Sequence, residues 1–252
     1  MSDLFWLTDA QMARLAPFFP KPHGKPRVDD RRVLSGIIFI NRNGLRWRDA
    51  PKEYGPHKTL YSRWKRWSEK GIFARMMAGL AAEHGEEKTV MIDATYLKAH
   101  RTATSMAGKK GGRGRLIGRT KGGMNTKLHA ICDSLGRPID LFVTAGQVSD
   151  YIGARVLLSG LPNVKWLLGD RGYDADWFRE ALQNKGIRAC IPGRKKRKKP
   201  VKYDKRRYKR RNRIEIMFGR LKDWRRVATR YDRCPKVFLS AVALAALVIY
   251  WL

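Results

Sequence analysis

The sequence predicts a mixed α/β domain preceded by a helical region, and two observations lead to this prediction. From residue 87 onward, short apolar runs alternate with amphipathic segments, which is the pattern of a sheet whose strands are connected by helices. Before residue 87, apolar residues recur at helical spacing and are punctuated by capping Asp and Thr residues and by Pro and Gly. We therefore expect a helical region at 1–86 and a sheet domain at 87–252.

The N-terminal region is expected to hold helices with clear start and stop signals. Thr8 can cap the first helix, which Pro20 ends, and Asp29 or Asp30 can cap the second, which ends before Gly44. The first two helices are therefore expected at 8–19 and 30–41, and a third is expected at 58–68.

The third expected helix interleaves aromatic and basic residues. Tyr61, Trp64 and Trp67 are three residues apart, a spacing that usually marks a stripe packed in the core. Arg63 and Lys65 lie between them, so an outward face could instead contact DNA phosphates, as in a helix-turn-helix module. Both interpretations stay open, because nothing in this segment identifies a recognition helix.

The second region is expected to contain a hairpin followed by alternating strands and helices. The turn from Asp133 to Gly136 makes the hairpin, and Asp133 has an ordinary turn role there. Asp150 and Asp174 are expected to cap helices. The apolar run 238–252 is about 15 residues long, fewer than the ~20 that span a bilayer, and predicts a buried helix. Strands are expected at 89–93, 127–132, 138–144, 164–168 and 187–191, and helices at 150–158 and 174–184.

The charge of the chain points to a polyanionic partner. Its 54 Lys and Arg residues against 22 Asp and Glu residues give a net charge of +32. Double-stranded DNA is the leading candidate partner, while an anionic membrane surface and a ribosomal or chromatin-like packing role are alternatives. The three cysteines are widely spaced, which favours neither a disulfide framework nor a zinc site and fits a reducing cytoplasm. The N-terminus has no signal-peptide pattern.

Two basic loops interrupt the expected sheet domain, at 101–123 and 193–207. The first is rich in glycine and includes Lys121, and the second begins with a cationic run that includes Arg194 and Lys195. We expect these loops to become ordered against an anion. The glycines do not match the phosphate-binding loop of ATPases, so an ATPase is disfavoured.

The segment from Tyr208 to Lys222 predicts a helix that presents one acid among cations. At 100° per residue, Tyr208, Arg211, Glu215 and Lys222 fall within roughly 60° of one another. An ordinary amphipathic helix with an Arg211–Glu215 ion pair is the simpler explanation. The alternative is that Glu215 is a functional carboxylate.

Two other acids favour that alternative. Asp93 and Asp170 are each expected at the end of an apolar strand, where a charge is costly unless it is solvated or coordinated. Together with Glu215 they form a set of oxygen ligands that suits Mg²⁺ or Mn²⁺. Two such ions would support phosphodiester cleavage or strand transfer on DNA. We therefore expect metal-dependent DNA chemistry.

The residues of this helix match a known signature. Tyr208, Arg211, Glu215 and Lys222 fit the pattern Tyr-x2-Arg-x3-Glu-x6-Lys, and the chain resembles the DDE transposases of bacterial insertion sequences, in the insertion-sequence-five branch. The supporting segments are Ile92-Asp93-Ala-Thr95, Ala99-His100-Arg101, Thr120-Lys-Gly-Gly-Met-Asn-Thr-Lys-Leu-His129, Gly136-Arg-Pro138, Thr144-Ala-Gly-Gln147, Gly169-Asp-Arg-Gly-Tyr-Asp174 and Ala228-Thr-Arg-Tyr-Asp232.

The resemblance implies an RNase H-like core in which Asp93, Asp170 and Glu215 bind two Mg²⁺ or Mn²⁺ ions. It also implies that Tyr208, Arg211 and Lys222 hold the transposon end. Ile216 departs from the family, which often has Arg directly after the Glu. The further candidate DNA contacts are His100, Lys121, Arg171, Arg194, Lys195, Arg63 and Lys65.

The function implied is a transposase that binds the terminal inverted repeats of its insertion sequence, cleaves the ends and joins them to target DNA. We expect a homodimer on DNA, because two ends must be brought together, and a cytoplasmic protein associated with the bacterial nucleoid, with no membrane partner. A metal-dependent nuclease without strand transfer and a catalytically silent DNA-binding protein are the alternatives.

Overall fold

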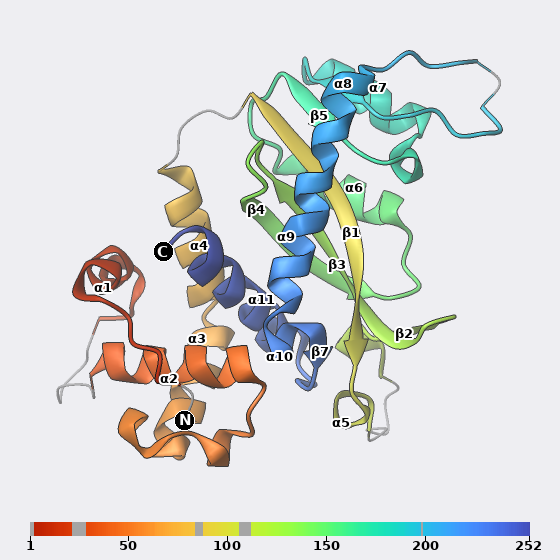
Figure 1. The fold of residues 1–252 in the computed structure, drawn as a ribbon. Helices are drawn as coiled ribbons and strands as arrows, with labels where there is room; N and C mark the ends of the chain where they lie inside the picture. The colour runs from red at the N-terminus through yellow and green to blue at the C-terminus, as the bar shows by residue number, and fades with distance from the viewer. Residues whose placement is uncertain (1–2, 22–28, 84–87, 106–111, 198) are drawn as a thin grey trace.

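The computed structural model describes residues 3–21, 29–83, 88–105, 112–197 and 199–252. The predicted boundary between the two regions, at residue 86, lies outside these residues and stays a prediction. Helices α1 to α4 gather on one side of the molecule, and a twisted sheet with further helices packed on it forms the other side, as Figure 1 shows.

The sheet is mixed. Strand β1 is antiparallel to β3, which in turn is antiparallel to β4, while β1, β5 and β6 run parallel. The central order β4-β3-β1-β5-β6 is that of an RNase H-like sheet, so the predicted fold class is confirmed. The strands are β1 (Thr89–Ala99), β2 (Gly118–Thr120), β3 (Gly123–Cys132), β4 (Pro138–Ala145), β5 (Trp166–Leu168), β6 (Arg188–Cys190) and β7 (Thr229–Arg230).

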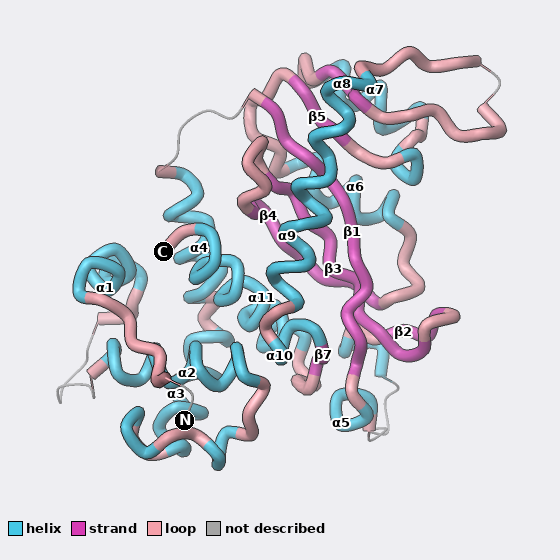
Figure 2. The backbone as a smooth tube through the Cα atoms, in the orientation of Figure 1, coloured by secondary structure: helices cyan, strands magenta, loops and turns pink. Residues whose placement is uncertain are grey.

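Helices cover both faces of this sheet (Figure 2). The N-terminal ones start and end at the predicted signals: Thr8 caps α1, Asp29 caps α2, and Gly44 ends α2 in the left-handed conformation. The helices are α1 (Asp9–Leu15), α2 (Asp30–Asn43), α3 (His57–Glu69), α4 (Ile72–Ala82), α5 (Arg101–Thr104), α6 (Asp150–Ser159), α7 (Asp176–Asn184), α8 (Lys205–Tyr208), α9 (Asn212–Lys222), α10 (Arg225–Ala228) and α11 (Pro235–Tyr250).

Two hydrophobic clusters lie on opposite faces of the sheet. Val90 and Ile92 of β1 pack with residues of α6 and α7. Met91 and Leu97 face the other way and share a cluster with α9, α11 and the N-terminal helices. Because side chains alternate along a strand, the odd-numbered residues of β1 face α9. The N-terminal helices and the sheet domain thus share one core.

The C-terminal helix α11 is at the centre of that shared core. It contacts α2, α3, α4 and β4, and its residues from Ala241 to Leu247 are buried, which confirms the predicted buried helix. No helix in the described part of the chain is both long enough and apolar enough to cross a bilayer.

Several sequence-based boundaries were wrong. Strand β1 continues to Ala99, because β3 supplies backbone partners as far as Lys98, so Asp93 lies inside the strand and not at its end. Part of the expected loop 101–123 is regular, since α5 and β2 lie within it; residues 106–111 of that loop are outside the described residues.

Two predicted helix caps were also wrong. Ser149 and Ala175 are the N-cap residues of α6 and α7. Asp150 instead accepts a hydrogen bond of 2.9 Å from Lys127 Nζ, and Asp174 binds the basic loop described below. Both acids thus have partners from distant segments: Lys127 for Asp150, and Arg179, Arg197 and the Arg194 N–H for Asp174. The turn role of Asp133 is confirmed, because its side chain accepts from the Leu135 and Arg137 N–H groups.

Candidate active site

Asp93 lies on the face of β1 that α9 covers. Its carboxylate is 18% exposed, and its Oδ1 accepts a hydrogen bond of 2.8 Å from the Ala94 N–H. Its neighbours on the same face of the strand, Met91 and Leu97, are buried in the core. The strand therefore presents a carboxylate from a largely apolar surface.

Helix α9 brings two charged side chains to this carboxylate. Arg211, just before the helix, donates from Nη1 to Asp93 Oδ2 at 2.7 Å. The same guanidinium donates from Nη2 to Glu215 Oε1. Glu215 is 57% exposed, whereas Arg211 is mostly buried. Arg211 thus joins the two carboxylates that the sequence predicted to act together.

The other end of α9 is attached to the same strand. Lys222 Nζ donates a hydrogen bond of 2.8 Å to Thr95 Oγ1. Burial lowers the pKa of Lys222. Thr95 is two residues after Asp93, so it lies on the same face of β1. Arg211, Glu215 and Lys222 therefore share one face, as predicted. The predicted helix is interrupted, because residues 209–211 form a short 3₁₀ turn before α9.

Asp170 follows β5, which is parallel to β1 and next to it. Its Oδ1 accepts a hydrogen bond of 2.8 Å from the Gly172 N–H, which caps a short 3₁₀ helix at Arg171–Tyr173. Tyr173 is buried, and burial raises its pKa well above the usual value, with Asp93 and Asp170 adding to the rise. The Asp170 carboxylate also adds to the rise in the pKa of Asp93.

Burial is the main influence on Asp93 and raises its pKa to about 6. The Ala94 N–H and Arg211 oppose this rise, and the Asp170 carboxylate adds to it. Burial is the largest single influence on Arg211 and lowers its pKa. The pKa is nevertheless raised overall, because Asp93 stabilises the charged guanidinium. Arg211 therefore only partly offsets the effect of burial on Asp93.

The donor set is the kind that a hard divalent cation prefers, since it consists of carboxylates. Within the residues that the structure describes, however, no three His, Cys, Asp or Glu side chains are close enough together to hold a metal ion. Arg211 lies between Asp93 and Glu215 instead. A cation that bound both carboxylates would compete with this guanidinium, and the exposed Glu215 is free to turn.

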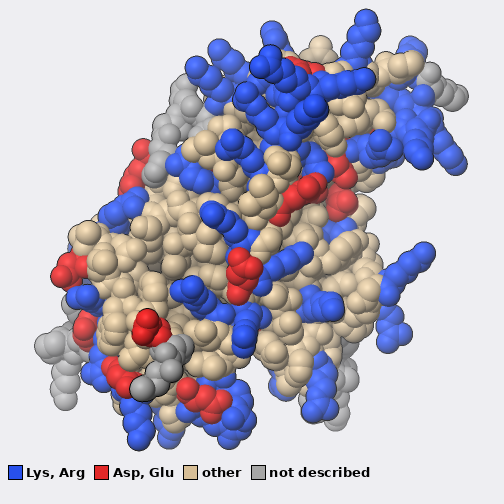
Figure 3. Space-filling view, in the orientation of Figure 1, with Lys and Arg blue, Asp and Glu red and all other residues tan. Residues whose placement is uncertain are grey.

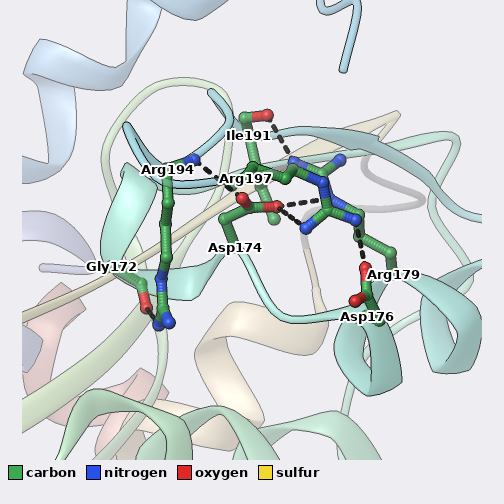
Figure 4. Close-up of polar contacts among 7 residues, drawn as sticks. All are labelled: Gly172, Asp174, Asp176, Arg179, Ile191, Arg194 and Arg197. Carbon is green, nitrogen blue, oxygen red and sulfur yellow. Dashed lines mark hydrogen bonds and ion pairs between the residues drawn. The ribbon is translucent and has the colours of Figure 1, made fainter. Parts of the chain in front are cut away.

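The second basic loop is attached beside Asp170 by a buried acid, Asp174 (Figure 4). Asp174 Oδ2 accepts from the Arg194 N–H at 2.8 Å, and its Oδ1 accepts from Arg179 Nε and Arg197 Nη1 at 2.7 and 2.9 Å. Burial would raise the pKa of Asp174, but these partners lower it overall. Arg194 also donates from Nη2 to the Gly172 carbonyl at 3.4 Å. The start of the loop is therefore fixed next to the candidate site.

The basic surface continues from this loop to α9. Figure 3 shows Lys and Arg side chains gathered over α8 and the adjoining loop. Tyr208 contacts both Tyr203 and Arg211. Its ring centroid is 5.5 Å from that of Tyr203 and 5.8 Å from the Arg211 Cζ atom. Ile216, where the family often has Arg, is exposed beside Arg213 and Arg220 in a shallow groove. The exposed cations on this surface are Arg194, Lys195, Lys196, Lys199, Lys202, Lys205, Arg206, Lys209, Arg210 and Arg213.

The other expected DNA contacts have different surroundings. Lys121 and Arg171 are exposed, and Lys65 is exposed with Glu69 3.9 Å away. His100 stacks on Tyr231 at 4.7 Å. The expectation for Arg63 was wrong: it is buried, and its Nη1 pairs with Asp30 at 2.7 Å. The aromatic stripe of α3 is therefore mainly a core stripe, as the simpler interpretation held.

Three side chains at this site were missed by the sequence analysis. Thr95 could have been found from strand alternation if the full length of β1 had been recognised. Tyr173 and the anchoring role of Asp174 had no local signal, because both depend on the approach of distant segments.

Two family models match the chain. Residues 84–251 match the family described as "Transposase DDE domain", and residues 7–77 match the one described as "Putative transposase of IS4/5 family".

The chain is similar to bacterial proteins, one of which is named as a transposase. It is 38% identical over 128 residues to a Brucella ovis protein named "Putative transposase for insertion sequence element IS6501", which covers 50% of this chain and 98% of that protein. It is 36% identical to an uncharacterized Sinorhizobium fredii protein, covering 42% of this chain and 87% of that one. A solved Mos1 transposase paired-end complex aligns over 82% of both chains, with 11% identity and a TM-score of 0.28, which is too low to support any argument.

The raised pKa of Asp93 predicts a pH-dependent effect on stability in metal-free protein. The ordinary value is 3.8 and the folded value is about 6, so this group stabilises the fold fully below about pH 3.8 and loses that contribution as pH rises through about 6. Asp93→Asn cannot ionise. Its unfolding free energy should exceed that of wild type by roughly 2–3 kcal/mol near pH 7.5, at 1.36 kcal/mol per pKa unit, and by nothing near pH 4.

Urea unfolding in the presence of EDTA at both pH values measures this difference. Asp223→Asn, an exposed acid after α9, is the matched control and should change stability little at either pH. An equal effect of Asp93→Asn at both pH values would contradict the burial argument.

The contacts of Asp174 predict the behaviour of the basic loop. Asp174→Ala removes the acceptor for Arg179, Arg197 and the Arg194 N–H, so trypsin should cut within 194–197 at least about ten-fold faster. Limited proteolysis with mass spectrometry measures the rate. Asp176→Ala, which removes only an exposed partner of Arg197, is the control. Equal cleavage of the two variants would show that Asp174 does not anchor the loop.

Proposed function

Since this chain belongs to the DDE transposase family of bacterial insertion sequences, we propose that it mobilises its own element by a cut-and-join reaction on DNA. In this proposal it binds the terminal inverted repeats, cleaves the DNA at the ends and transfers the freed 3′-hydroxyls into target DNA. The observation that carries the proposal is the set of three carboxylates, Asp93, Asp170 and Glu215, on adjoining elements within a strongly basic surface.

We propose that these three carboxylates hold the divalent ions. DDE transposases generally use divalent metal ions, and carboxylate oxygens are the ligands that Mg²⁺ and Mn²⁺ prefer. Two bound ions would supply the charge that activates a water or 3′-hydroxyl and stabilises the leaving oxygen of the phosphodiester. The surroundings of Asp93 support this role, because burial raises its pKa and a bound cation would stabilise the ionised form that burial disfavours.

Arg211 has a double role in this proposal. In the DNA-free protein its guanidinium neutralises Asp93 and Glu215. When ions bind those carboxylates, the guanidinium becomes available for a phosphate of the DNA end, which it can contact through two N–H groups. Lys222, next to Thr95 on the same face, would bind a second phosphate, and Tyr208 would pack against the sugar–phosphate backbone.

The surrounding cations would position the duplex. Arg194 and Lys195 are on the loop that Asp174 anchors beside Asp170, so phosphates bound there would lie next to the carboxylates. Arg171, directly after Asp170, is proposed as a further contact near the carboxylates, and Lys121, His100 and Lys65 as additional contacts. Arg63 is not included, because it is buried with Asp30.

We further propose that the N-terminal helical region contributes to recognition of the repeats, and that the protein acts as a homodimer on DNA in the bacterial cytoplasm. Two ends have to be joined to one target, and two active sites are the simplest arrangement that performs this. The net charge of +32 favours assembly on DNA, because the polyanion neutralises the repulsion between two copies.

A strand-transfer assay tests the function. The substrate is a duplex with the terminal repeats that flank the gene, incubated with Mg²⁺ and a target plasmid. Asp93→Asn, Asp170→Asn and Glu215→Gln should each lower joined product at least about a hundred-fold, since a lost metal ligand costs several kcal/mol in the transition state. Asp223→Asn, which also removes one acid near α9, should retain activity.

Nicked and joined products are counted separately. Nicking without joining would identify a nuclease and overturn the strand-transfer step. Retention of wild-type joining by any of the three triad variants would remove that residue from the proposed triad.

A further inference from the structure

A second candidate site lies between the N-terminal helices and the segment that follows β7. It is a cavity of about 440 Å³, within the usual size range for small-ligand pockets. Trp47, Tyr61, Trp64 and Lys65 line it from one side, and Arg226 and residues 231–234 line it from the other. None of these residues belongs to the candidate active site.

The cavity is distant from Asp93. Tyr231, one of its lining residues, stacks on His100, the residue directly after β1. Asp93 and Ala99 are six residues apart on that strand, or roughly 20 Å at 3.3 Å per residue. A ligand here would bind apart from the reacting phosphate.

The walls of the cavity are aromatic. The ring centroid of Trp47 is 5.6 Å from that of Tyr61 and 6.0 Å from that of Trp64. Tyr61 and Tyr231 are 47% and 38% exposed, so each has ring surface that the protein does not cover. Exposed aromatic faces of this kind are surfaces on which planar ligands stack.

Three of the lining side chains also have buried polar atoms that are unpaired in the described part of the protein: Trp64 Nε1, Arg226 Nε and Asp232 Oδ2. Trp64 is fully buried and Arg226 nearly so. A buried polar atom without a partner costs free energy, and such atoms usually mark a site for water or a ligand. Here the three atoms are covered by protein, and Arg226 pairs with Asp232 at 3.6 Å, so the cavity itself presents aromatic rings and the cations Lys65 and Arg233.

The lining segment is held rigidly. Arg230, fully buried, donates to the carbonyls of Asp232 and Arg233 at 2.8 and 3.0 Å and to Thr126 Oγ1 at 2.6 Å. Arg226 Nη2 donates to the Leu45 carbonyl at 3.0 Å, which links the two sides of the cavity. A site held in this way loses little entropy when a ligand binds.

We propose that this cavity binds a single unstacked nucleobase of the DNA. A base has π-faces that can stack on the exposed rings of Tyr61 and Tyr231. Lys65 and Arg233 at the cavity would contact the phosphates on either side of that base. The inference rests on the proposed function only in taking DNA as the ligand.

Other ligands fit less well. A free phosphate would lie beside the Asp232 carboxylate and against apolar rings, which offer it no hydrogen bonds. An apolar ligand would make no use of Lys65 and Arg233, the cations that line the cavity. A base with its flanking phosphates uses both the rings and the cations.

The test uses a single-stranded oligonucleotide of abasic sugar–phosphate units that carries one 2-aminopurine, and a matched oligonucleotide that is wholly abasic. Wild type should quench 2-aminopurine fluorescence and bind the base-containing probe about ten-fold more tightly than the abasic one, at fixed ionic strength. Tyr61→Ala should abolish the quenching and this difference, and Tyr61→Phe should keep both.

Tyr96→Ala is the matched control, because Tyr96 is 51% exposed and does not line this cavity. It should behave as wild type. Equal affinity of wild type for the two probes, or equal effects of Tyr61→Ala and Tyr96→Ala, would overturn the inference. Loss of binding to both probes and to duplex DNA would instead overturn the proposed function.

Discussion

The arrangement of the candidate site depends on one guanidinium, that of Arg211, which joins Asp93 on β1 to Glu215 on α9. A carboxylate as buried as Asp93 needs a counter-charge, and without one its ionised form would oppose folding. Arg211 supplies that charge from the start of α9 and so fixes where the helix crosses the sheet. The contact between Lys222 and Thr95 fixes the other end. Because both ends of α9 are attached to the same strand, the helix has little freedom to slide along the sheet.

The same pairing of acids and arginines recurs across this basic chain. Asp174 holds the loop that carries Arg194 and Arg197, and Asp133 binds Arg137 in the hairpin turn. The chain has 22 acidic residues and 54 basic ones. The few buried carboxylates hold nearby arginines in place, while most of the positive charge stays exposed. The cost is repulsion over the whole surface, which DNA would relieve. The protein thus presents its cations in a fixed arrangement around the three carboxylates.

The elements with strong periodicity could be predicted from the sequence, and so could the shared face of Arg211, Glu215 and Lys222, since both follow from local geometry. The length of β1 could not, because the residues after Asp93 are mixed in polarity and their strand conformation depends on pairing with β3. Arg63 was misassigned for a similar reason: its burial depends on Asp30, which comes from another helix. The cavity beside Tyr61 was not predicted either, since its two sides come from opposite ends of the chain.

The central proposal is that Asp93, Asp170 and Glu215 come together around divalent ions when these bind and displace Arg211 from between Asp93 and Glu215. Titration of Mn²⁺ into the protein bound to its end duplex, followed by electron paramagnetic resonance, measures this directly. The account predicts that Asp93→Asn weakens Mn²⁺ binding at least about ten-fold, as expected when a ligand is lost, while Asp223→Asn leaves it unchanged. Equal Mn²⁺ affinity of wild type and Asp93→Asn would contradict it.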